Sequence, residues 1–186
     1  MTILNNSKEY DDVWNKVYSD LGFKPSCDYR GHSLNVSLPF SIGEPHIIYA
    51  IENMSDNSLE NFEELVRTCL INCSTNDEWY ALDWNHSAFR FNPRNKEEMK
   101  SVTIKDERYF GGEYIAYFPD FYPDGDYYFF IDTKFENGYL GHPWRKEIWV
   151  YGRYLIDEIK KIAEILNWRL IKDTLEMVPE EDLIKG

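Results

Sequence analysis

The chain has 186 residues, a length typical of one domain with a sizeable hydrophobic core. Its formal net charge is −13, with 20 Lys and Arg against 33 Asp and Glu, and this excess of acid disfavours nucleic acid and anionic membrane surfaces as partners. Aromatic residues reach 17%, more than a generic core needs, and large rings also serve as anchors in protein interfaces. The composition therefore favours a folded acidic protein that attracts a basic protein partner.

The N-terminal segment predicts one helix followed by turns. A helix is expected over residues 6–21, because Asn6 is a good N-cap, apolar residues recur at helical spacing, and Gly22 is a typical terminator. Residues 23–46 contain proline and glycine at short intervals, which predicts turns and short extended pieces.

A buried strand and a second helix are expected next. Residues 46–51 are apolar or aromatic without polar alternation, as in a strand that is buried on both faces. Residues 58–73 predict a helix that places Cys69 and Cys73 on one apolar face. With Cys27 they make an odd number of cysteines without a Cys-x-x-Cys pair, so we expect small core side chains rather than a disulfide framework or a zinc site.

Residues 79–84 and 88–91 predict strands around a turn, and residues 94–108 are a charged stretch with one exposed turn. Residues 114–151 predict a succession of strands and turns, including a tight turn at Asn137-Gly138. Together with residues 46–51 they predict a mainly antiparallel sheet. We expect helices to cover one face of it, which gives an α+β fold with about three helices.

The C-terminal part predicts a third helix over residues 153–166, a left-handed stop at Asn167 and a last strand over 168–172. Residues 1–172 are therefore expected to form a single domain. The acidic residues 173–186 contain a proline and are expected to form a poorly ordered tail.

The chain lacks the common catalytic signatures: a Walker loop, a GxGxxG turn, a nucleophile elbow and a His-Glu-x-x-His pair. We therefore expect a binding protein rather than an enzyme, with neither cofactor nor metal. The N-terminal residues lack the features of a signal peptide, and no stretch approaches the ~20 apolar residues of a membrane span. These features predict a cytoplasmic protein.

The densest group of polar and aromatic residues is Pro-Asp-Gly-Asp-Tyr-Tyr at 123–128, followed by Gly-His-Pro-Trp at 141–144. In one interpretation Asp124 and Asp126 flank a ligand, with His142 as a base. In the other, which we favour, both segments are turns, because turns select the same residue types. We then expect an Asp carboxylate to bind backbone amides, Trp144 to be packed, and His142 to bond a carbonyl or an Asp.

Asp83 and His86 form a second candidate pair. They have the residue types of an acid–base pair, although we favour the alternative that they mark a strand end with an Asx-type turn.

These motifs carry a family resemblance. Trp79–His86, Phe89–Pro93, Tyr122–Phe130 and the Gly-His-Pro-Trp segment together resemble the bacterial family known as domain of unknown function 2716, best over residues 79–166. The resemblance implies kinship only, because that family brings no assigned activity, cofactor or catalytic residue.

Acidity, surplus aromatic residues and the lack of catalytic motifs favour a small bacterial protein-binding module, of the immunity or antitoxin type, that neutralises a basic toxin domain. Two alternatives stay open: an enzyme or small-ligand-binding protein that uses Asp124, Asp126 and His142 with His86, and a structural module without a separable site. The residues expected to contact a protein partner are Trp144, His142, Tyr139, Asp124 and Asp126.

Overall fold

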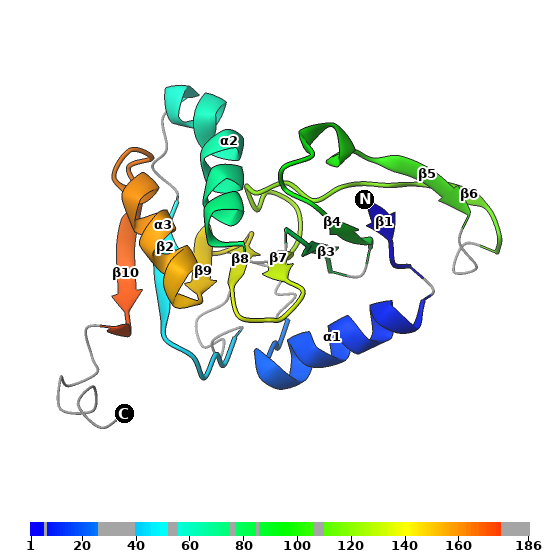
Figure 1. The fold of residues 1–186 in the computed structure, drawn as a ribbon, viewed down its shortest axis with the longest axis horizontal. Helices are drawn as coiled ribbons and strands as arrows, with labels where there is room; N and C mark the ends of the chain where they lie inside the picture. Colours follow the sequence, from blue (N-terminus) through cyan, green and yellow to red (C-terminus); the bar gives the residue numbers. More distant parts are fainter. Residues whose placement is uncertain are drawn as a thin grey trace.

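An eight-stranded antiparallel sheet forms the centre of the computed structural model, and a separate two-stranded hairpin extends beyond one of its edges (Figure 1). The structure describes residues 1–5, 7–25, 40–51, 56–74, 77–84, 86–105 and 110–175, and of residues 56–60 it describes the backbone alone. This arrangement confirms the α+β fold and the mainly antiparallel sheet that the sequence predicts.

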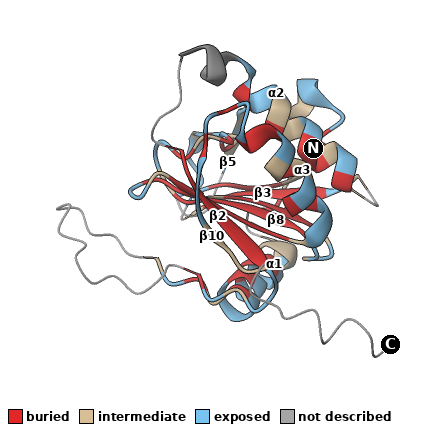
Figure 2. Cartoon of the chain, turned by 90° about the vertical axis from the view of Figure 1, so that its left-hand side faces the viewer, coloured by how far each residue is buried: buried red, intermediate tan, exposed pale blue. Residues whose placement is uncertain are grey.

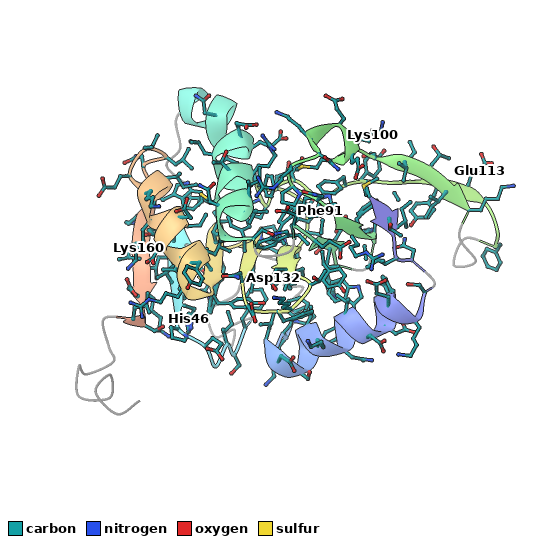
Figure 3. The ribbon with its side chains drawn as sticks, viewed as in Figure 1. His46, Phe91, Lys100, Glu113, Asp132 and Lys160 are labelled. Carbon is teal, nitrogen blue, oxygen red and sulfur yellow. The ribbon has the colours of Figure 1, made fainter. Side chains whose placement is uncertain are left out.

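The strands of the large sheet follow the order β1-β4-β3-β7-β8-β9-β2-β10, and all neighbours pair antiparallel. Their bounds are β1 (Thr2–Ile3), β2 (His46–Ala50), β3 (Trp79–Asp83), β4 (Ala88–Phe91), β7 (Tyr128–Asp132), β8 (Gly138–His142), β9 (Glu147–Tyr151) and β10 (Arg169–Asp173). The hairpin consists of β5 (Val102–Lys105) and β6 (Glu113–Ala116), and a short 3-10 turn, η1 (Lys96–Glu98), precedes it. Figure 3 shows Glu113 on this projecting hairpin and Phe91 in the crowded interior.

Three helices pack on the sheet: α1 (Lys8–Asp20), α2 (Asp56–Cys73) and α3 (Arg153–Ala163). Ser7 is the N-cap of α1, and its hydroxyl accepts the amide of Tyr10 at 3.1 Å; the predicted cap, Asn6, lies outside the described residues. Gly22 follows α1 with φ +55°, as its predicted role as terminator requires. No helix within the described ranges is both long and apolar enough to cross a membrane.

Helices cover both faces of the sheet, so the expectation of one covered face is wrong. One core contains α2, α3 and strand residues such as Phe130, whereas a second core contains α1 and the neighbouring strand residues Phe129 and Ile131. Figure 2 shows the buried strands between these two helical layers. Successive side chains of a strand point to opposite faces of the sheet. A strand that is apolar at every position therefore contributes side chains to the cores on both faces.

The C-terminal strand extends further than predicted. β10 pairs with β2 and ends at Asp173, which forms an ion pair with Lys160 of α3, and Thr174 exchanges hydrogen bonds with His46. The strand therefore ends one residue later than predicted, and residues 176–186 of the predicted tail lie outside the described residues. Asn167 has φ 55°, which confirms the predicted left-handed stop after α3.

The predicted position of the turn at Asn137-Gly138 is wrong by a few residues. The chain turns over residues 133–136, and Gly138 already opens β8. The side-chain amide of Asn137 donates to the carboxylate of Asp132 at 2.7 Å (Asp132 is labelled in Figure 3). The ring of Tyr151 occupies the space that a side chain at position 138 would need. Packing on the strand, rather than turn geometry, accounts for this glycine.

Candidate functional site

Segments far apart in the sequence meet at one end of the sheet. Asp83, the last residue of β3, pairs with Tyr128, the first residue of β7, and Tyr128 pairs with Gly141 near the end of β8. Pro123 also packs against Gly141, where an added Cβ would lie 2.8 Å from the Cβ of Pro123. The sheet register thus brings together three of the four segments that carry the family resemblance: Trp79–His86, Tyr122–Phe130 and the Gly-His-Pro-Trp segment.

A cavity of about 540 Å³ opens at this end of the sheet, and we call it the sheet-end pocket. Its lining comes from the β3–β4 connection, from the hairpin strand β6 and from the start of β7: Asp83, His86, Ser87, Tyr114, Ile115, Tyr117 and Tyr128. The side chain of Asn5 joins these elements, because its amide donates to the Tyr114 hydroxyl at 2.6 Å and its oxygen accepts the Ala88 amide at 3.0 Å.

Two carboxylates and an imidazole gather beside the pocket. The ligand-type atoms of Asp83, His86 and Asp126 all lie within 4.8 Å of one another, and Nε2 of His86 is 3.6 Å from Oδ2 of Asp126. Asp83 is only 8% exposed, and its Oδ1 has no hydrogen-bond partner in the part of the chain that the structure describes. Asp126 is oriented by its own neighbour, since Oδ1 accepts the amide of Tyr127 at 2.7 Å.

The electrostatics of this cluster favour a positive charge or a proton. Burial, and then the negative charge of Asp126, raise the pKa of Asp83 to about 8. Burial also raises the pKa of Asp126, although the Tyr127 amide and His86 oppose that shift. Two adjacent, partly desolvated carboxyl groups cannot both be ionised cheaply, so a proton or a cation between them would relieve their repulsion.

His142 lies apart from this cluster, inside the protein. Its ring packs on Tyr127, with the centroids 4.8 Å apart, and Nε2 lies within hydrogen-bond distance of the Tyr127 hydroxyl, at 3.4 Å. Burial, with a smaller contribution from Arg145, lowers the pKa of His142 to about 3. Among the described residues its hydrogen-bond partner is thus a tyrosine hydroxyl, whereas we expected a backbone carbonyl or an Asp.

The remaining residues of the two turn segments divide between surface and core. The backbone bends at 124–126 without forming a helix, and the carboxylate of Asp126 accepts a backbone amide, as predicted. Asp124 is exposed, and Trp144 is 49% exposed with its edge on Tyr127, so the expectation of a packed Trp144 is wrong. Tyr139 is fully buried, and its hydroxyl donates to the carbonyl of Phe121 at 2.9 Å.

In the sequence, Asp83 and His86 form one candidate pair and Asp126 lies in another motif, and nothing there indicates that the three side chains meet. The sequence also gives no sign of the pocket walls, which are formed by Ser87, Tyr114, Ile115, Tyr117 and Tyr128. Three of these lie on or beside β6, and their position depends on where the hairpin packs, a contact without a local sequence signal.

Comparison with known proteins places this arrangement in a family. The model of a family described as "Protein of unknown function (DUF2716)" matches residues 4–156. The chain belongs to that family. The match covers α1 and β2 as well as residues 79–156, and it includes Asp83, His86 and Asp126.

A relative of this DUF2716 chain is the "Uncharacterized protein YxiI" of Bacillus subtilis (strain 168). The two are 28% identical over 172 residues, which cover 88% of this chain and 94% of the relative. No solved structure matches the chain.

Proposed function

We propose that this chain is a small acidic protein-binding module, of the bacterial immunity or antitoxin type, that neutralises a basic toxin domain. The observation that carries the proposal is the sheet-end pocket, where carboxylates and partly exposed aromatic rings share one concave surface.

The surroundings of the pocket have the composition of a protein interface. Tyr117 is 63% exposed and Ile115 is 48% exposed on the pocket wall, and Trp144 extends from the neighbouring strand end. Asp120 and Asp124 add exposed carboxylates near Tyr128. Tyrosine and tryptophan are typical interface anchors, and a Lys or Arg side chain from a partner would find both carboxylate and ring contacts here.

Charge supports the same choice of partner. A net charge of −13 attracts a basic protein over long range and repels nucleic acid and anionic lipid. We further propose that the protein acts in the cytoplasm, since Cys69 and Cys73 are free thiols in the core, a cysteine usage typical of reducing compartments.

A small-ligand or catalytic role through Asp124, Asp126 and His142 has less support. His142 is enclosed by Tyr127 and Trp144, whereas Asp126 faces His86. A ligand in this protein would instead meet Asp83, His86 and Asp126. The third alternative is a structural module. If it holds, substitution of the exposed side chains around the pocket will not weaken the binding of any partner.

The test first captures a protein partner and then asks whether this chain protects cells from it. The tagged chain is used as bait in a lysate of a bacterium that carries it, beside the variants Tyr117→Ala and Trp144→Ala and the control Tyr154→Ala, whose ring is 71% exposed on α3. We expect wild type and control to retain a basic protein that both pocket variants lose. Each variant is checked for an unchanged melting temperature.

The captured protein is then expressed alone and together with this chain. The proposal expects growth arrest by the captured protein alone and growth restored by co-expression. A captured protein that is harmless alone, or one that the pocket variants retain fully, would contradict the immunity function.

A further inference from the structure

We infer that Asp83, His86 and Asp126 form a binding site for one divalent transition-metal ion at the sheet-end pocket. This inference is independent of the proposed partner, because it concerns the isolated chain.

The first support is the geometry of the three donors. Their ligand-type atoms lie within 4.8 Å of one another, with His86 Nε2 and Asp126 Oδ2 already 3.6 Å apart. Donors that share one zinc ion at about 2.0–2.2 Å stand roughly 3–4 Å from each other. Small rotations of the side chains therefore suffice to close the three donors on an ion.

The second support is the state of Asp83. Its side chain lines the pocket while the residue is more than nine-tenths buried, and Oδ1 has no hydrogen-bond donor among the described residues. A buried acceptor without a partner destabilises the fold, and a second carboxylate nearby adds repulsion. A cation between Asp83 and Asp126 removes both penalties.

The third support is the orientation of Asp126. The Tyr127 amide holds Oδ1 at 2.7 Å, and Oδ2 is the oxygen directed at His86. In metal sites, a carboxylate that binds the ion is typically itself held by a hydrogen bond. Here the hydrogen bond fixes one oxygen and leaves the other free for an ion.

The donor set indicates the class of metal. One imidazole nitrogen with two carboxylate oxygens suits Zn²⁺, Mn²⁺ or Fe²⁺, whereas Ca²⁺ and Mg²⁺ prefer oxygen ligands alone and Cu⁺ prefers sulfur. Three protein ligands leave coordination positions open, and these would face the pocket between Tyr114, Tyr117 and Tyr128. The ion would then be accessible to a small ligand or to a partner's side chain.

The experiment is isothermal titration of the purified, chelator-treated chain with ZnCl₂ and, separately, with MnCl₂. We expect one ion per chain, and tighter binding of Zn²⁺ than of Mn²⁺. Asp83→Asn, His86→Gln and Asp126→Asn should each weaken binding by at least about tenfold, since loss of even a supporting group has that effect. Circular dichroism and the melting temperature verify that each variant is folded.

Asp124→Asn is the matched control, because it removes an exposed carboxylate of the same turn without removing a proposed ligand. It should bind Zn²⁺ like wild type. The inference is overturned by an absence of binding, by several weak ions per chain that Asp124→Asn reduces as much as Asp126→Asn, or by tight binding that survives His86→Gln.

Discussion

His142 is buried as a neutral imidazole, and this state couples folding to pH. Its pKa falls to about 3 in the folded protein, mainly through burial, from the ordinary value of 6.5 that the unfolded chain retains. Between pH 3 and pH 6.5 the unfolded state binds more protons at this histidine than the folded state does. The titration of His142 therefore leaves the free energy of unfolding unchanged above about pH 6.5, and it lowers that free energy progressively as the pH falls toward 3.

We expect the free energy of unfolding of wild type to fall by about 2 kcal/mol more than that of His142→Gln between pH 7 and pH 5. Urea unfolding of both proteins at the two pH values measures the difference. Equal losses would show that His142 is protonated in the folded state or is solvated.

Gly152 provides a second prediction for a single residue. It precedes α3 with φ +88°, and an added Cβ would lie 2.3 Å from Oδ1 of Asn137 and 2.4 Å from the carbonyl of Glu136. Gly152→Ala should therefore lower the free energy of unfolding by about 3 kcal/mol, through backbone strain and overlap. Gly43→Ala is the control, because nothing lies within 4 Å of its added Cβ, and it should cause no loss. A similar small effect of both substitutions in chemical unfolding would contradict this account.

Helix α1 is a full layer of the fold rather than an appendage. Trp14, on its buried face, meets the ring of Phe129 edge-on at 5.6 Å in the second core. Trp14→Ala should lower the free energy of unfolding by about 3–5 kcal/mol, as other large truncations in cores do. Tyr154→Ala, on the exposed face of α3, should change it by less than about 0.5 kcal/mol. A loss below 1 kcal/mol for Trp14→Ala would mean that α1 is only loosely held.

For the whole molecule, the net charge of −13 predicts that association with a basic partner depends on salt. The association rate with the captured basic protein should fall steeply as ionic strength rises from about 0.01 M to 0.15 M, because the screening length shrinks from ~30 Å to ~8 Å. Stopped-flow mixing over a salt series measures this rate. A rate that is independent of salt would remove long-range attraction from the recognition of that partner.

The elements with local signals were predicted closely. Gly22 ends the first helix, Asn167 has the predicted left-handed backbone after the third, and Cys69 and Cys73 share a buried helix face. Each of these features depends on backbone preference or helical spacing within a few residues. The apolar strands were also recognisable, since composition and run length are local properties.

The sequence by itself therefore determined the α+β class, the three helices, the antiparallel strands and the acidic surface. Tertiary structure alone decided that helices cover both faces, that Trp144 stays at the surface while His142 is enclosed, and that Asp126 meets Asp83 and His86. The physical reason is that these outcomes depend on sheet register and on contacts between distant segments. The pairing of Asp83 with Tyr128 and the packing of β6 beside them create the pocket, and neither has a signature within its own stretch of chain.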